Sequence, residues 1–184
     1  MPNRRKKGII LKKILIAVDI QKDFVDGSLG TSEAQAMLPN AVNKIQNHNG
    51  PIIVTYDTHS EDYLSTPEGK KLPVKHCIKG TDGWKLDPHI EFALKSKNFT
   101  AVEKPTFGSV NLPQKVLELS GGDEFEIELI GLCTDICVVS NALLLKAHFP
   151  DVKISVVSDC CAGVTKELHE NALAVMRSCQ IDIV

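Results

Sequence analysis

The sequence lacks the features that mark a membrane protein or a nucleic-acid-binding protein. Its formal net charge is only −2, so it has no general electrostatic attraction to nucleic acid or to an anionic membrane surface. No apolar stretch reaches the roughly 18–20 residues of a membrane-spanning helix. The first thirteen residues are basic, but the apolar run that follows (14–18) is shorter than the ~7–15 residues of a signal-peptide core and is closed by Asp19. We therefore expect residues 1–10 to be a basic extension ahead of the folded domain.

Three sequence motifs are also missing. The six cysteines include no CxxC pair, and a chain of 184 residues needs no disulfide to hold its core, so we expect reduced thiols and a cytoplasmic location. The first apolar run is followed by 21–24 (QKDF) rather than by GxGxxG, which argues against a dinucleotide-binding protein. No internal repeat or low-complexity tract divides the chain. With 43% hydrophobic residues, 11–184 is expected to form one domain.

Six apolar segments alternate with helical patterns. Two of these segments, 52–54 and 156–157, show little polar alternation, as expected for strands buried on both faces. The alternation of strands and helices predicts parallel βαβ units with right-handed crossovers. We therefore predict a three-layer α/β/α, Rossmann-like domain with a six-stranded, mostly parallel sheet. The strands are expected at 13–19, 51–56, 98–103, 124–130, 152–157 and 180–184.

Helix signals lie between these strands. The segment 31–33 is expected to open one helix, and the pair Thr134 and Asp135 is a good N-cap for another. The long polar stretch 57–84 is predicted to be a loop, and loops of that length are usually functional or disordered. The helices are expected from Thr31 to about 47, from 87 to about 95, and at 112–120, 136–147 and 165–178.

Four successive strands lead to residues that can do chemistry. Asp19 ends the first strand, Asp57 and His59 follow the second, Lys104 ends the third, and Cys137 follows the fourth after a glycine turn. In open parallel α/β sheets, ligands bind beyond the carboxyl ends of the strands. We therefore expect an acid, a lysine, a thiol and a candidate metal pair to meet at one edge of the sheet.

Cys137 is the strongest candidate for a nucleophile. It is expected in the first turn of a helix, where unpaired N–H groups and the helix dipole favour the thiolate and could also stabilise an oxyanion. Asp19 could serve as the base that a thiol needs, and Lys104 would keep both partners ionised. Taken singly, each has a structural interpretation: a buried cysteine, a turn cap and a solvated lysine. A redox pair with Cys133 is a weaker alternative.

Asp57 and His59 form a candidate metal pair. Alternate residues of an extended segment point to the same side, so both can reach one ion, and His76 could be a third ligand. Mixed nitrogen and oxygen ligands suit zinc, manganese or iron(II) rather than calcium or magnesium. The structural alternative is that the pair only orders the loop. A fourth ligand is expected among the nearby acids Glu61, Asp62 and Glu68.

Five sequence blocks together resemble the isochorismatase-like cysteine hydrolases, and within them the nicotinamidase/pyrazinamidase branch. The blocks occur in order along the chain, and the resemblance extends from about residue 12 to the end. The most specific block is 131–138, and its coexistence with 18–24 makes the resemblance strong. The blocks are 18–24 (VDIQKDF), 56–59 (YDTH), 76–81 (HCIKGT), 103–105 (EKP) and 131–138 (GLCTDICV).

The resemblance implies a role for each candidate residue. Asp19, Lys104 and Cys137 would form the catalytic triad, and the main-chain N–H groups of Cys133 and Cys137 the oxyanion hole, with a cis peptide between Leu132 and Cys133. A divalent transition metal would be bound, with zinc the first expectation and manganese or iron the alternatives. Its ligands would be Asp57, His59 and His76, with Glu68 as a fourth.

The reaction that the resemblance implies is hydrolysis of nicotinamide to nicotinate and ammonia through a thioester. Phe24 matches an aromatic substrate-binding position, and Phe107 is a second candidate. Two departures weaken the assignment of the substrate: Pro73 stands where nicotinamidases tend to carry Trp or Phe, and 105–109 differs from the usual segment. We expect a small-molecule amide as partner and a homo-oligomeric assembly.

Two rival interpretations remain open. One is a metal-free relative that hydrolyses another C–N bond, in a carbamoyl or ureido group, and metal analysis of the protein would distinguish it. The other is a non-enzymatic α/β binding protein, which would retain every measured property after Cys137→Ala.

Overall fold

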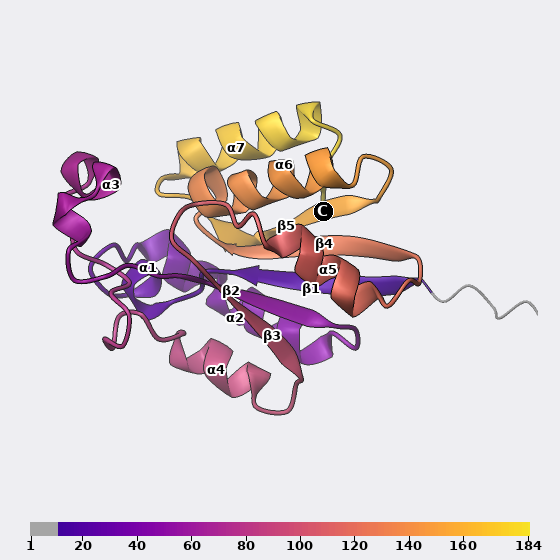
Figure 1. Cartoon of the computed structure of the whole chain (residues 1–184), viewed down its shortest axis with the longest axis horizontal. Coiled ribbons are helices and arrows are strands. Elements are labelled where there is room, and N and C mark those ends of the chain that lie inside the picture. The colour runs from indigo at the N-terminus through magenta and orange to yellow at the C-terminus, as the bar shows by residue number, and fades with distance from the viewer. Residues whose placement is uncertain (1–10) are drawn as a thin grey trace, which may run out of the picture.

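The computed structural model describes residues 11–184, and the extension expected at 1–10 lies outside the described residues. Six parallel strands form one sheet in the order β3-β2-β1-β4-β5-β6 (Figure 1). The predicted six-stranded α/β sheet is therefore confirmed, and it is parallel throughout. The strands are β1 (Lys12–Val18), β2 (Ile52–Asp57), β3 (Phe99–Lys104), β4 (Phe125–Leu132), β5 (Ile154–Ala162) and β6 (Asp182–Ile183).

Strand β1 lies at the centre of the sheet and is buried on both faces. It pairs with β2, where Leu15 is opposite Ile52, and with β4, where Ile14 is opposite Ile127. Its side chains alternate between two hydrophobic cores, with Leu15 and Ala17 in one and Ile14 in the other. The uninterrupted apolar run at 14–18 therefore reflects a strand that is covered on both sides.

Helices cover both faces of the sheet, which gives three layers (Figure 1). Helices α1, α2 and α4 pack on the face of Leu15, whereas α5, α6 and α7 pack on the opposite face. No helix within residues 11–184 is both long and apolar enough to cross a membrane. The α-helices are α1 (Lys22–Val25), α2 (Ser32–Asn47), α3 (Pro67–Lys71), α4 (Pro88–Leu94), α5 (Leu112–Ser120), α6 (Val139–His148) and α7 (Lys166–Ser178).

One predicted helix start is wrong. Thr31 does cap α2, because its hydroxyl accepts a hydrogen bond from the Ala34 N–H at 3.0 Å. Thr134 and Asp135, in contrast, do not cap α6; they lie in a π-helical turn, η2 (Thr134–Val138), that runs into it. The Thr134 hydroxyl instead hydrogen-bonds to Nδ1 of His169 on α7 at 2.8 Å. The Thr134 side chain, which the local sequence predicts to cap a helix, is therefore used in a contact between two helical segments.

The stretch 57–84 contains more structure than the predicted loop. It holds a short 3₁₀ turn, η1 (Tyr63–Ser65), and helix α3, which lies apart from the sheet at the left of Figure 1. Strand β5 is also longer than predicted and contains both Cys160 and Cys161.

The sheet order creates a switch point at its centre. Strands β1, β2 and β3 follow one another toward one edge, and β4 then returns to the other side of β1. The carboxyl ends of β1 and β4 therefore flank the place where ligands bind in folds of this type. Asp19 and Cys137 follow these two ends.

Candidate active site and metal centre

The structure brings Asp19, Lys104 and Cys137 together in one buried cluster. The Lys104 ammonium lies 2.6 Å from Oδ2 of Asp19 and 3.6 Å from Sγ of Cys137. It also donates a hydrogen bond to the main-chain carbonyl of Thr106 at 3.1 Å. All three side chains are at most 4% exposed, so the charges interact without much screening by water. The strand-end prediction thus placed these three residues correctly.

The backbone and side chain of Asp19 are both constrained by the fold. It has a positive φ of 47°, a conformation that few residues besides glycine, asparagine and aspartate adopt readily. The Thr55 hydroxyl donates a hydrogen bond of 2.6 Å to Oδ1. Oδ2 has the ion pair with Lys104 but no partner in hydrogen-bond geometry among residues 11–184. One carboxylate oxygen is therefore held by Thr55, and the other lies against the Lys104 ammonium.

The electrostatics of the pair correct the expectation of a resting thiolate. Burial raises the pKa of the Cys137 thiol well above its ordinary value, and the Asp19 carboxylate raises it further. Burial also raises the pKa of Asp19, although Lys104 acts in the opposite direction. Desolvation therefore shifts the pKa of Cys137 in the direction opposite to the one that its place near a helix start predicted.

Lys104 supplies the compensating positive charge. Burial works against its ammonium form, but the carboxylates of Asp19 and Asp57 raise the pKa of Lys104 above its ordinary value. The lysine is therefore a permanent cation and not a proton donor in this site. Its positive charge balances the negative charge of the Asp19 carboxylate, and the same ammonium group lies beside the Cys137 sulfur.

Asp57, His59 and His76 form a second cluster beside the first. Oδ2 of Asp57 lies 3.0 Å from Nε2 of His59 and 3.5 Å from Nε2 of His76. Oε1 of Glu68 lies 3.7 Å and 3.8 Å from the same two nitrogens. The other oxygen of Asp57 is 3.4 Å from the Lys104 ammonium, so this carboxylate belongs to both clusters.

These residues fit a divalent transition metal. The ligand atoms of Asp57, His59 and His76 all lie within 4.8 Å of one another, and all three residues are buried. Nδ1 of His76 is 2.8 Å from the Val74 carbonyl, which leaves Nε2 as the nitrogen that faces the cluster. Two imidazole nitrogens with carboxylate oxygens are the donors preferred by zinc, manganese or iron.

Of the three acids considered as a fourth ligand, only Glu68 reaches the cluster. Glu61 pairs with Lys75 at 3.0 Å and is largely exposed. Asp62 accepts a hydrogen bond from Ser60 and is also exposed. Helix α3 is what carries Glu68 over the histidines.

Three residues that support the site were not predicted from the sequence. Tyr63 is fully buried, and its ring centroid lies 4.7 Å from that of His59 and 4.9 Å from that of His76. Gln21 is also fully buried; its Oε1 accepts a hydrogen bond from the Asp57 N–H at 2.8 Å. Asn141 is the third, and its Nδ2 donates a hydrogen bond to the Cys137 carbonyl at 2.8 Å. The position of Gln21 in the block 18–24 was a usable signal, whereas Tyr63 and Asn141 carried none.

A pocket of about 220 Å³ opens onto both clusters. Phe24 and Phe107, the two predicted aromatic positions, both line it, and Leu72 rather than the adjacent Pro73 contributes to its wall. Drug-sized ligand pockets usually start near ~300 Å³, so this one suits a very small molecule. Its lining residues are Phe24, Leu29, Thr31, Asp57, Glu68, Leu72, His76, Phe107, Cys133, Ile136, Cys137 and Val164.

The start of η2 has the backbone feature that the resemblance implied. The Leu132–Cys133 peptide bond is cis. Cys133 and Cys137, whose N–H groups were expected to form an oxyanion hole, both line the pocket.

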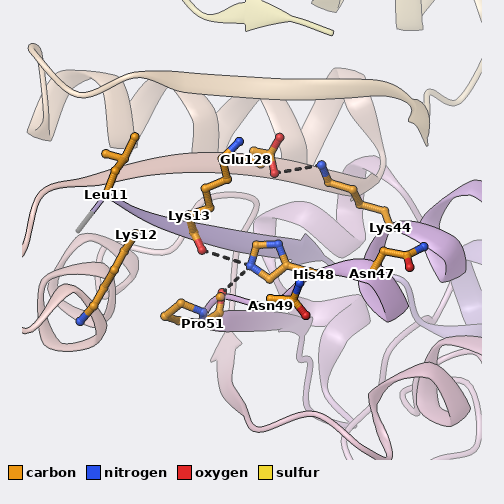
Figure 2. A pocket seen from close by; sticks show the side chains of 10 residues that line it. Leu11, Lys12, Lys13, Lys44, Asn47, His48, Asn49, Pro51 and Glu128 are labelled. Atoms are coloured by element: carbon orange, nitrogen blue, oxygen red, sulfur yellow. Dashed lines mark hydrogen bonds and ion pairs between the residues drawn. The ribbon is translucent and has the colours of Figure 1, made fainter. Parts of the chain in front are cut away.

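A larger hollow of about 600 Å³ lies at the opposite, amino ends of β1 and β2 (Figure 2). Its polar groups already have partners in the fold. Lys44 forms an ion pair with Glu128 at 2.9 Å, and Nε2 of His48 hydrogen-bonds to the carbonyls of Lys13 and Pro51. None of its lining residues is a cysteine. Volume therefore does not identify the functional site here, whereas the grouping of reactive side chains does.

The fold and the site together define a doubly wound α/β protein with a buried cysteine, acid and lysine at its switch point. Residues 13–184 match the family model of the isochorismatase domain. The chain therefore belongs to the isochorismatase family, as the sequence blocks predicted.

Individual relatives agree with this family assignment. An uncharacterized isochorismatase family protein, PncA, of Bacillus subtilis (strain 168) is 32% identical over 177 residues, or 89% of this chain and 93% of the relative. The crystal structure of nicotinamidase/pyrazinamidase PncA from Bacillus subtilis is similar with a TM-score of 0.80 at 28% identity, covering 95% of this chain and 100% of that one. The structure of Pyrococcus horikoshii pyrazinamidase in complex with zinc has a TM-score of 0.74 at 25% identity, covering 94% and 98%.

Proposed function

We propose that this protein is a metal-assisted cysteine amidohydrolase and that nicotinamide is its leading substrate. The observation that carries the proposal is the meeting of Cys137, Asp19 and Lys104 beside the Asp57, His59 and His76 cluster at the mouth of one small pocket. The similarity to a nicotinamidase/pyrazinamidase over nearly the whole chain supports the reaction class and the substrate.

In the proposed mechanism, Asp19 takes the proton from Cys137 as the sulfur attacks the carboxamide carbonyl. The N–H groups of Cys133 and Cys137 stabilise the oxyanion of the tetrahedral intermediate. Asp19 then gives its proton to the amine as the C–N bond breaks, which releases ammonia and leaves a thioester on Cys137. A water molecule, deprotonated by Asp19, hydrolyses the thioester and yields the carboxylic acid and the free thiol. Lys104 keeps its charge and holds Asp19 in place throughout.

The metal ion would be held by Asp57, His59, His76 and Glu68, and when bound it supplies a Lewis-acidic point that orients a substrate ring through its nitrogen. The remaining substrate contacts come from the pocket wall. Phe24 lies with its ring centroid 5.5 Å from that of His76, next to the donor cluster. A planar ring between Phe24 and Phe107 would present its carboxamide to Cys137.

Ammonia release from a panel of small carboxamides and ureido compounds tests the proposal. Nicotinamide is expected to turn over, a chelator is expected to suppress the reaction, and Cys137→Ala is expected to remove it. If only ureido compounds react, and do so equally well with chelator, the metal-free rival is correct. If Cys137→Ala leaves every activity unchanged, the protein is not a cysteine hydrolase.

We also propose zinc as the bound ion, 11–184 as a single domain, a cytoplasmic location and a homo-oligomeric assembly. Zinc is supported by the donor set and by the zinc complex of the Pyrococcus relative. Elemental analysis of the purified protein tests the metal, and light scattering tests the assembly.

A further inference from the structure

Asn141 is a buried polar residue on α6, one turn beyond Cys137. Its side chain is 0% exposed, although the neighbouring buried positions of that helix face, Ala142 and Leu145, are apolar. A buried carboxamide is costly unless its groups are hydrogen-bonded. The contacts of Asn141 therefore indicate why a polar residue is kept there.

The carboxamide of Asn141 bonds to three main-chain groups in two separate segments. Nδ2 donates to the Cys137 carbonyl at 2.8 Å and to the Phe107 carbonyl at 3.1 Å. Oδ1 accepts from the Ser109 N–H at 2.9 Å. Both N–H donors and the carbonyl oxygen are thus used, and the pattern requires an amide, since a carboxylate has no hydrogen to donate.

The two segments that Asn141 joins both contribute residues to the lining of the pocket. One is the η2 turn that carries Cys137. The other is the loop 105–111, which begins directly after Lys104 and carries Phe107 into the pocket wall. Phe107 is 42% exposed, so burial of its own ring does little to fix it. Its main chain is fixed instead by the bonds from Asn141.

We propose that Asn141 is a positioning residue that sets the Phe107 wall at a defined distance from the Cys137 sulfur. This inference rests on the proposed function, since it concerns how the pocket holds its substrate. Asn141 is not among the residues that line the pocket, and it acts through the main chain of the two segments that do. Its loss should loosen substrate binding more than it slows the chemical step, because it bonds the main-chain carbonyl of Cys137, whereas Lys104 contacts the sulfur and Asp19 directly.

Steady-state kinetics with nicotinamide test the proposal through a double-mutant cycle. Asn141→Leu keeps the branched shape of the side chain and removes its bonds to the three main-chain groups, and it is expected to raise KM about tenfold with little change in kcat. Phe107→Ala is expected to raise KM similarly. In the Phe107→Ala background, Asn141→Leu should add less than about twofold, because the wall it positions is already gone.

A second variant and a matched control separate positioning from general damage. Asn141→Ser keeps a hydroxyl for one of the three partners and should give an intermediate KM if Asn141→Leu does not fold. Ser140→Ala removes a hydroxyl that bonds only the Ile136 carbonyl on the same helix and should leave KM unchanged. Hydrogen exchange of the Ser109 amide should speed up in the Asn141 variants and not in Ser140→Ala.

The outcomes distinguish this inference from the function beneath it. Suppose that the wild type is active. The positioning role alone is then overturned if the effects of Asn141→Leu and Phe107→Ala on KM multiply, or if Ser109 exchange is unchanged in the Asn141 variants. A wild type that releases ammonia from no amide overturns the proposed function, and with it this inference, even if Ser109 exchange responds as expected.

Discussion

Burial is what determines the behaviour of individual residues in this site. Cys137, Asp19 and Lys104 are all removed from water, and each charge is tolerated only because a partner lies within contact distance. Desolvation raises the pKa of both Cys137 and Asp19, and the Lys104 ammonium acts in the opposite direction on both. In the proposed mechanism Asp19 must be ionised to accept the proton of Cys137.

The hydrogen bond from Thr55 to Asp19 should be visible in the pH profile. This bond lowers the pKa of Asp19, so Thr55→Val should raise it. Because the base works in its ionised form, kcat/KM is lost as pH falls through this pKa, and a higher pKa moves the loss to higher pH. We expect the acid limb of kcat/KM to shift up by about one pH unit. Thr100→Val, on the edge strand β3, is the control and should not move the limb.

At the scale of the elements, the backbones of β1 and β4 lie so close together at Gly131 that no side chain fits between them. Gly131 has a φ of 120°, and a Cβ there would lie 2.1 Å from the Val18 carbonyl oxygen. The close approach of these two strands allows Asp19 and the η2 turn to meet. Only glycine satisfies both the conformation and the spacing.

Gly131→Ala should therefore destabilise the protein severely. Both the positive φ and the contact with the Val18 backbone oppose a methyl group, and we expect a loss of more than ~3 kcal/mol in the free energy of unfolding, measured by urea denaturation. Gly108→Ala is a matched control, because its nearest neighbour would lie at 3.6 Å, and it should change stability by less than about 0.5 kcal/mol. Equal effects of the two substitutions would contradict this explanation.

The segment that carries Glu68 depends on Tyr63. The tyrosine ring packs against both histidines, and its hydroxyl donates a hydrogen bond to the Leu72 carbonyl at 3.0 Å. Tyr63→Leu should weaken zinc binding about tenfold, as the loss of supporting contacts around metal ligands commonly does. Competition with a chromophoric chelator measures the affinity. Tyr63→Phe keeps the ring and should lose much less; an equal loss would assign the role to the hydroxyl instead.

The sequence predicted elements and strand ends better than it predicted the contacts between elements. Asp19, Lys104 and Asp57 were placed correctly because a parallel sheet gathers its carboxyl ends at one edge. The predicted start of α6 was wrong because the Thr134 side chain hydrogen-bonds to His169, a residue 35 positions away. Asn141 and Tyr63 were missed for the same reason, since nothing near them in sequence indicates their partners.

For the molecule as a whole, the metal should be a source of stability as well as of activity. A ligand that binds only the folded state stabilises it by about 2.7 kcal/mol when its free concentration is about 100 times Kd. Added zinc should therefore raise the melting temperature and a chelator should lower it. The shift should persist in Cys137→Ala and disappear in His76→Ala. A shift that survives in His76→Ala would place the ion elsewhere.

Asp57 gives the two clusters a shared member, with one oxygen toward Lys104 and the other toward the histidines. A change in charge near one oxygen of that carboxylate therefore changes the electron density on its other oxygen. Thermodynamic reciprocity then requires that any tightening of substrate binding by the ion be matched by an equal tightening of the ion by substrate. An enzyme of this kind would bind its ion most tightly while substrate is bound and less tightly when substrate is absent.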